Sequence, residues 1–332
     1  LSAQDYSIYR AIKSFDWPGK ANLAVSMVWI FNGPWRGQFH LDGNQVAGVT
    51  PALAPQGRIT GEPKRLIANI GLAFQGSNAR GMGFVLNHAE AAALISADSR
   101  NSEVIFPFLG GDDILSNPDQ SPSRWIINFF DWSQDKASSY LMPFKIVQER
   151  VLPERLKIKD EVKRRTLSRD FWKYDSQAKA LYKKIGTMTK YMVHPLTSKH
   201  HVFGIYAPGI TIGHTAAIVA LSNWDDFALL QSGIHWAWAL EYGNKLATRP
   251  QYLPTTCFDT FAFPLALCAE MAGLGESFYV KRKELTSSRA IGATTAHNLI
   301  DSASETSSDV VELRTLMEKI DKAVLASYGW DD

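Results

Sequence analysis

The sequence lacks the features that usually place a chain in a class at once. Its two cysteines, Cys257 and Cys268, are too few for a disulfide framework and do not have metal-site spacing. We therefore expect both to be small buried apolar residues in a protein of the reducing cytoplasm. The longest apolar stretch, residues 260–274, is interrupted by Pro264 and Glu270 and is shorter than the roughly 20 residues of a membrane-spanning helix. A disulfide-stapled secreted domain and a membrane protein are thereby excluded.

The common catalytic signatures are also missing. The chain contains no Gly-x-Gly-x-x-Gly loop, no Walker loop, no HExxH and no Gly-x-Ser-x-Gly. Two acidic pairs are present, Asp112 with Asp113 and Asp225 with Asp226. A metal site needs three or more converging ligands, so we expect these four side chains to be solvated carboxylates in turns.

Two adjacent histidines, His200 and His201, lie in an extended segment. Successive side chains of an extended chain point to opposite faces, so the pair is poorly suited to binding one metal ion. We expect one histidine to donate hydrogen bonds toward a ligand and the other to donate toward the core.

The first residue, Leu1, is preceded by no methionine, and no basic or apolar leader follows it. This start is neither a signal peptide nor a natural beginning, so we expect a fragment of a longer protein. A length of 332 residues predicts two or three domains. Hydrophobic residues make up 45% and charged residues 20%, which is the composition of a folded protein.

Positive charge is concentrated in one segment although the net charge is only +2. Residues 145–190 contain fourteen Lys or Arg against six Asp or Glu. Several basic side chains near phosphates displace condensed counterions, so the segment predicts a polyanionic partner. A charged helix that merely faces solvent is the alternative.

The stretch NPDQSPSRWIINFFDW, residues 117–132, begins like a damaged Asn-Pro-Pro-aromatic loop of adenine methyltransferases. That loop needs an aromatic ring in its fourth position to stack on the extruded base, and here the fourth residue is Gln120. An Asn-Pro-Asp turn that leads into a strand accounts better for these residues. The catalytic interpretation is therefore set aside, and residues 125–130 are expected to alternate as a strand.

Periodicity predicts elements along the whole chain. Residues 23–33 form a continuous apolar run, which predicts a strand buried on both faces. Asn87 is expected to cap a helix over the residues that follow. Residues 226–243 read as one helix that ends at a glycine, and residues 191–209 as a β-turn-β element. After Pro264 the chain should be helical, with a capping-box-like start at Asp309 and Glu312.

Several separated motifs resemble one family, the MmeI-like restriction-modification enzymes and related adenine DNA methyltransferases. They are FPFLGGDDIL, PSRWIINFFDW, KYMVHPLTSKHHVF, IHWAWALEYGNKL and, most specific, RPQYLPTTCFDTFAFP of residues 249–264. Three earlier motifs, SFDWPGKANLAVSMVWI, LDGNQV and AFQGSNARGMGF, resemble the end of the family's methyltransferase domain. The final SYGWDD resembles the end of the family's C-terminal helical region. The resemblance covers nearly the whole chain in the right order.

The resemblance implies an α+β fold in three parts. Residues 1–62 would be the terminal strands of a class I methyltransferase domain, 63–265 a mixed α/β target recognition domain, and 266–332 a C-terminal helical region. It further implies recognition of double-stranded DNA in a prokaryotic cytoplasm, as part of a restriction-modification or phage-defence system. The S-adenosylmethionine loop and the catalytic loop of the family lie upstream of Leu1, in the methyltransferase domain that would be this fragment's partner. The fragment alone is therefore expected to bind no cofactor and to methylate nothing.

Base-reading positions of the family lie before the Arg-Trp strand and after the Thr-Ser pair. Carried onto this chain they are Gln120 and Ser121 in one loop and Lys199 and His201 in another. The chemistry is suitable, because Gln pairs bidentately with adenine while Lys and His donate to guanine acceptors. Solvent-exposed polar residues without such a role are the alternative.

Other residues are expected to contact the DNA backbone or to pack. Arg80 lies between glycines, so its backbone can approach a phosphate, with a plain turn arginine as the alternative. Further backbone contacts are expected from Lys163, Arg164, Arg165 and Lys173. Phe15 and Trp17 lie where related methyltransferases place a ring against the flipped base, although packing in a turn is also open. Arg124 is expected to anchor a buried carboxylate. Residues expected to be structural are Thr255, Thr256, Phe258, Phe261 and Phe263. Trp172 and Tyr174 are expected to pack in the core, with stacking on nucleic acid as the alternative.

Two other functions remain open. The chain could be a protein-interaction module of a defence complex, which predicts a large exposed apolar patch and no affinity for DNA. It could also be a nuclease that uses Asp112, Asp113 and a histidine, which predicts that these side chains cluster.

Overall fold

The structure is a computed structural model that describes residues 6–17, 24–50, 53–56, 63–246 and 249–330. The chain forms two compact units. Unit 1 comprises Leu1–Lys64 with Lys245–Arg249, and unit 2 comprises Arg65–Asn244 with Pro250–Asp332. Strands β13 (Asn244–Leu246) and β14 (Arg249–Gln251) contain residues of both units. No helix in the described ranges has the length and apolarity that a membrane span requires.

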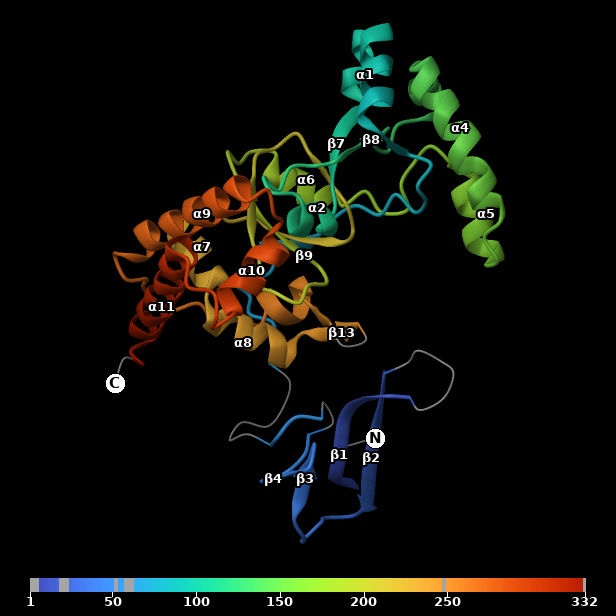
Figure 1. Cartoon of the computed structure of the whole chain (residues 1–332). Helices are drawn as coiled ribbons and strands as arrows, with labels where there is room; N and C mark the ends of the chain where they lie inside the picture. Colours follow the sequence, from blue (N-terminus) through green and yellow to red (C-terminus); the bar gives the residue numbers. More distant parts are fainter. Residues whose placement is uncertain (1–5, 18–23, 51–52, 57–62, 247–248, 331–332) are drawn as a thin grey trace. The chain divides into compact units, whose positions relative to one another are not determined.

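Unit 1 is built on one four-stranded sheet, drawn in blue in Figure 1. The strand order is β2-β1-β3-β4, in which β1 pairs antiparallel with β2 and parallel with β3. Its elements are β1 (Tyr6–Asp16), β2 (Ala24–Asn32), β3 (Phe39–Leu41) and β4 (Asn44–Val46). Asp42 and Gly43 both have positive φ, as the tight turn between β3 and β4 requires.

Strand β2 corrects one prediction. The strand expected over residues 23–33 is confirmed, but its burial on both faces is wrong, because Met27 is 43% and Ile30 46% exposed. Met27 and Ile30 point to opposite faces, so side chains are exposed on both faces of β2, which is also the edge strand of its sheet. An apolar edge strand of nine residues is a surface on which further strands pair.

Unit 2 contains two four-stranded sheets. The first has the order β10-β9-β12-β5 and is antiparallel throughout, and the second has the order β11-β7-β8-β6 with β11 parallel to β7. The strands of the first sheet are β5 (Ala73–Gln75), β9 (Tyr191–Pro195), β10 (Gly204–Tyr206) and β12 (Ala216–Val219). The strands of the second are β6 (Val85–Leu86), β7 (Ile105–Leu109), β8 (Arg124–Ile127) and β11 (Thr211–Ile212). The β-turn-β element over residues 191–209 is thereby confirmed.

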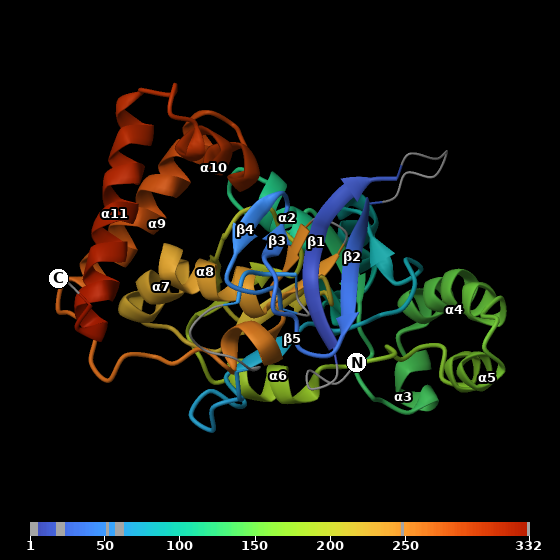
Figure 2. The ribbon, with the colours of Figure 1, turned by 90° about the horizontal axis from the view of Figure 1, so that it is seen from below.

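Helices surround these sheets, and Figures 1 and 2 place α4 and α5 at one end of unit 2 and α9 to α11 at the other. In chain order, the helices before β9 are α1 (His88–Ala97), α2 (Gly111–Ser116), α3 (Gln134–Ser138), α4 (Leu141–Leu156), α5 (Glu161–Arg169) and α6 (Lys179–Ile185). The helices after β12 are α7 (Trp224–Gln231), α8 (Gly233–Tyr242), α9 (Met271–Ser288), α10 (Ala293–Asp301) and α11 (Ser308–Tyr328). A 3₁₀ turn spans Ser99–Glu103 and a π-helical turn spans Pro254–Phe258.

Local signals explain where several helices begin. Asn87 caps α1 with a complete capping box, in which its side chain accepts from Glu90 N and Glu90 accepts from Asn87 N, each at 2.8 Å. The single helix expected over residues 226–243 is instead two, because Ser232 is extended and its hydroxyl accepts from His235 N at 3.1 Å. Ser232 thus begins a new helix in the middle of the apolar pattern.

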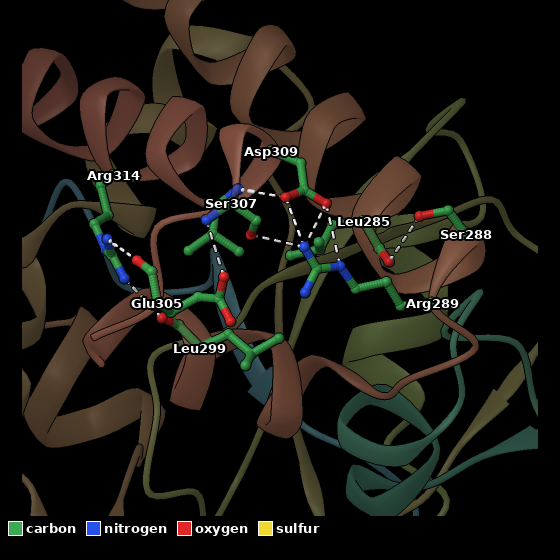
Figure 3. A network of polar contacts seen from close by, with 9 residues as sticks. Leu285, Ser288, Arg289, Leu299, Glu305, Ser307, Asp309 and Arg314 are labelled. Carbon is green, nitrogen blue, oxygen red and sulfur yellow. Dashed lines mark hydrogen bonds and ion pairs between the residues drawn. The ribbon is translucent and has the colours of Figure 1, made fainter. Parts of the chain in front are cut away.

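The C-terminal region is helical as predicted, but its last helix starts differently. Ser307 precedes α11 without a side-chain cap. The Asp309 carboxylate accepts bidentate hydrogen bonds from Arg289 at the end of α9 (Figure 3). Arg314 of α11 donates to the carbonyls of Leu299 and Glu305, at 2.9 and 2.7 Å (Figure 3). These two arginines join the ends of α9, α10 and α11.

The largest core of unit 2 is shared between the predicted recognition domain and the predicted helical region. Buried Val219, Leu229 and Phe258 belong to the same cluster as Leu313 and Ile320 of α11. The core therefore does not divide at residue 265, and the proposed division into three domains stays a prediction.

Candidate nucleic-acid interface

The first predicted base-reading loop, residues 117–123, is closed by its own hydrogen bonds. Asn117 Nδ2 donates to the Ser121 carbonyl at 2.6 Å, and Asp119 Oδ1 accepts from Ser121 N at 3.0 Å. The hydrogen bond from Ser121 N lowers the pKa of the Asp119 carboxyl. The loop is thereby held in one shape with the Ser121 side chain exposed.

Gln120 does not face outward, and this corrects its predicted role. Its side chain is 7% exposed, and Nε2 donates to the Ile114 carbonyl of α2 at 3.0 Å. Its own carbonyl accepts from Tyr206 Oη at 2.9 Å. The left-handed backbone of Gln120, with φ 59°, turns the side chain toward the end of α2. The amide that was expected to pair with adenine is therefore used inside the protein.

Asp113 joins the start of α2 to the end of the first loop. The buried carboxylate accepts from Gly110 N at 2.8 Å and from Ser123 Oγ at 2.5 Å. Arg124 Nη2 lies 3.8 Å from Asp113 Oδ2, which confirms that Arg124 anchors a buried carboxylate. The expectation that Asp113 is solvated is wrong, because α2 and the loop enclose it, whereas Asp112 is exposed. The lone pairs that a nuclease metal would need are occupied by the fold.

The second loop, residues 196–203, lies between β9 and β10 and exposes Lys199. Ser198 Oγ accepts from His200 N at 3.1 Å, which tightens the turn around Lys199. Lys199 Nζ donates to Asn298 Oδ1 of α10 at 3.0 Å. Lys199 is thus an exposed cation whose position is fixed by a partner from another part of the chain.

His201 is buried, and this corrects its predicted role as well. Only 6% of the residue is exposed, its Nδ1 faces His194 Nε2 at 3.1 Å, and its ring stacks on Trp236 at 4.8 Å. Burial lowers the pKa of His201 to about 3. Its neighbour His200 points elsewhere, toward Asn298 and Asp301, although it too is buried. The two histidines do diverge as expected, but neither side chain is exposed.

The described residues contain no group of three or more His, Cys, Asp or Glu side chains that could hold a metal ion. The clustering of Asp112, Asp113 and a histidine that a nuclease predicts is therefore not found in this part of the chain.

Comparison with known proteins identifies the family. The family model described as "MmeI, target recognition domain" matches residues 59–265, which contain both loops. The chain belongs to the MmeI target recognition domain family. The predicted resemblance is thereby confirmed.

One solved structure shares the fold of this chain. The type IIL restriction-modification enzyme MmeI in complex with DNA matches with a TM-score of 0.73 and 16% identity, over 99% of this chain and 44% of that chain. The chain therefore spans less than half of the length of the MmeI chain. The type IIG restriction endonuclease BpuSI matches at 12% identity over 82% of this chain and 32% of that chain, with a TM-score of 0.33 that is too low to show a common fold. No curated protein matches the sequence.

The mixed α+β class is confirmed by this likeness, with several small sheets and a helical C-terminal region. The assignment of the unit 1 strands to a methyltransferase domain stays a prediction.

The basic segment of the target recognition domain presents several free cations on and after α5. Lys163 and Arg165 are exposed, and Arg164 is half-buried with Nη1 donating to the Ile158 carbonyl at 3.3 Å. Lys173 is half-buried with its ammonium 5.5 Å from the Trp172 ring. Within the described ranges none of these four cations has a carboxylate within ion-pair distance. Their charge is available to a polyanion, and their contact with DNA stays a prediction.

Arg80 differs from these cations because it is already paired. It has φ 49°, and its Nη1 lies 3.0 Å from Asp175 Oδ2. A phosphate would have to compete with Asp175 for the guanidinium. The structure thus gives Arg80 the features of a turn arginine, which was the alternative interpretation. Its contact with the DNA backbone stays a prediction.

Arg155 was missed by sequence reasoning. It is buried, and its Nη1 and Nη2 donate to four carbonyls, among them Ala79 at 3.1 Å and Lys173 at 2.8 Å. Burial lowers its pKa to about 10. Arg155 therefore joins the Arg80 turn to the end of α5 and the residues just after it. Its place in α4, four residues after buried Val151, is the one signal that could have predicted its burial.

Several packing predictions are confirmed. Trp172 and Tyr174 are buried, and their polar atoms donate to the carbonyls of Trp132 and Ile127 at 2.9 and 2.8 Å. Phe258 and Phe261 are buried in the largest core, against which Phe263 packs. Thr256 Oγ1 lies beside Cys257, whereas Thr255 is exposed, so the structural role of Thr255 stays a prediction.

Phe15 and Trp17 lie in unit 1, at and just after the end of β1. Phe15 is half-buried and Trp17 is 51% exposed. An exposed indole can stack on a base, so the role of Trp17 against a flipped base stays a prediction.

Proposed function

We propose that this chain is the DNA-specificity portion of an adenine-specific DNA methyltransferase of the MmeI-like type, within a restriction-modification or phage-defence system. The observation that carries the proposal is the family match over residues 59–265, which contain both predicted base-reading loops. The MmeI structure of similar fold is a complex with DNA. Lys199 and Ser121 are the exposed loop residues that would meet base edges, while Lys163, Arg164, Arg165 and Lys173 would meet phosphates.

Unit 1 would supply the closing strands of the methyltransferase sheet. The exposed apolar edge of β2 is suited to pairing with strands from an upstream part of the same protein. S-adenosylmethionine, the methyl donor, would be held upstream. The described residues of unit 1 form strands only, without a glycine-rich loop that opens a helix, so they do not fit this cofactor.

A mobility-shift titration on random duplexes at rising salt tests the proposal. Binding should be measurable at low salt and should weaken steeply as salt rises, because phosphate contacts release counterions. No binding at low salt, or binding indifferent to salt, would contradict a DNA-binding role.

One observation favours a second candidate, a protein-interaction module. A pocket of about 680 Å³ is lined mainly by apolar residues of α8, the 261–265 segment and the end of α11, among them Trp238, Phe263 and Trp330. An exposed apolar surface of this kind is typical of a protein contact site. This candidate predicts no affinity for DNA, so the same titration separates the two.

A further inference from the structure

We propose that Asn298 of the C-terminal helical region takes part in base reading, both by positioning Lys199 and by presenting its own amide N–H groups, and that α10 sets the spacing between the two loops. The proposal rests on the proposed function and deepens it. Asn298 lies outside residues 59–265, the segment that the family model covers. It would direct the Lys199 ammonium toward guanine in the major groove.

The contact between Asn298 and the second loop has a specific geometry. Asn298 Oδ1 accepts from Lys199 Nζ at 3.0 Å and lies 2.9 Å from His200 Nε2. On the next turn of α10, Asp301 Oδ2 lies 3.2 Å from His200 Nδ1. Two consecutive loop residues are therefore held by one face of α10, and the flexible Lys199 side chain loses freedom before any ligand arrives.

The contact between Lys199 and Asn298 leaves several of their N–H groups exposed as hydrogen-bond donors. An ammonium has three N–H groups, and one of them is used by Asn298 Oδ1. Because Oδ1 faces two loop residues, the Asn298 amide nitrogen is directed away from them, and Asn298 is exposed. The free N–H groups of Lys199 and Asn298 complement two neighbouring acceptors, which guanine presents as O6 and N7.

The local charge favours a base edge over a phosphate. The carboxylate of Asp301, which is 61% exposed, lies against the same loop and offsets the charge of Lys199. A phosphate would be repelled by Asp301, whereas the edge of a base carries no net charge. The small pocket beside this site has a volume of about 160 Å³ and includes Lys199, Asp301 and His297 in its lining. His297 Nε2 is buried there without a hydrogen-bond partner.

Helix α10 is fixed at both ends, where it contacts the end of α2, which leads into the first loop, and the second loop itself. At its start, a Cβ on Gly292 would come within 2.4 Å of the Leu115 carbonyl, just before the first loop. At its end, Arg314 donates to the carbonyls of Leu299, Ile300, Ser302 and Glu305, as Figure 3 shows for Leu299 and Glu305. From Gly292 to Asn298 the helix rises about 9 Å, which is roughly three base-pair steps. The helix therefore acts as a spacer between the loops.

The test is a selection of binding sites from randomised duplexes by the 332-residue chain and its variants. Asn298→Ala should reduce discrimination at one G·C pair about tenfold with salt dependence unchanged, and should lower thermal stability slightly because buried His200 loses a hydrogen-bond partner. Asn298→Asp keeps an acceptor for Lys199 and should restore part of the discrimination. Thr295→Ala, at an exposed position of the same helix, is the matched control and should select the wild-type site.

Base analogues identify the group that is read. With 7-deazaguanine at the affected pair, the wild-type chain should lose affinity and Asn298→Ala should lose little more, because the contact is already weakened. If Asn298→Ala selects the wild-type site with undiminished stringency, the positioning role is overturned while the proposed function stands. If the wild-type chain selects no site at all, the proposed function fails and this inference fails with it.

Discussion

His194 and His201 face each other in the core of unit 2, with Nε2 and Nδ1 3.1 Å apart. Both rings are buried, and burial lowers the pKa of each, as it also does for His235 and His297. These four histidines are therefore neutral in the folded protein, whereas in the unfolded chain they take up protons near pH 6.5.

This difference predicts that the protein loses stability in mild acid. The unfolded state binds more protons below about pH 6.5, so the free energy of unfolding falls as the pH drops, by up to about 1.4 kcal/mol per pH unit for each histidine. Burial also raises the pKa of two carboxyls, Asp226 to about 6 and Asp321, and these act in the opposite direction, but they are fewer than the histidines. Urea unfolding at pH 7.5 and pH 5.5 measures the effect. Equal stability at the two pH values would mean that the histidines are not held neutral.

Gln120 is expected to contribute to stability and not to base reading. Gln120→Ala removes the donor to the Ile114 carbonyl and leaves that acceptor unpaired, at a cost of about 1–2 kcal/mol. The selected DNA site should be unchanged. Ser121→Ala, at the exposed neighbouring position, is the matched comparison and should leave stability unaffected. A changed site for Gln120→Ala, measured by selection from random duplexes, would restore the role first predicted for this residue.

Removal of charge from α5 should weaken DNA binding without a change in specificity. A Lys163→Ala, Arg165→Ala double variant removes two exposed cations, so the slope of log affinity against log salt should become shallower by about 0.9 for each phosphate that is no longer neutralised. Lys145→Ala is the control, because Lys145 already lies 3.8 Å from the Glu149 carboxylate. If the control lowers the slope as much as the double variant, α5 is not a distinct phosphate-binding surface.

Arg155 should be essential for holding the end of α5 and the residues after it in place. Arg155→Met keeps much of the volume but leaves four carbonyls without their donor, so we expect a decrease of about 3 kcal/mol in the free energy of unfolding. Arg155→Lys retains the charge but has no planar fork and should recover only part of this decrease. Chemical unfolding of the three proteins measures this order. A fully stable Arg155→Met variant would contradict it.

The sequence allowed prediction of features that depend on local signals. The Asn87 cap, the β9–β10 pair and the anchoring of a buried carboxylate by Arg124 follow from residues close together in the chain or from one strong partner preference. The family motifs further located the two loops.

The direction of individual loop side chains could not be predicted in the same way. Gln120 turns inward because of a left-handed backbone and a contact with Tyr206, which is 86 residues away. Asn298 reaches Lys199 across 99 residues, and no local pattern marks either partner. The exposure of β2 also escaped prediction, because an apolar run does not reveal what packs over the two faces of its strand.

Selection from fully randomised duplexes by the wild-type chain at moderate salt is the most direct test of sequence-specific recognition of DNA. We expect enrichment of one short defined site, with a G·C pair whose selection depends on Lys199. Retention of DNA without any enriched sequence would contradict this role, since phosphate contacts alone do not distinguish bases.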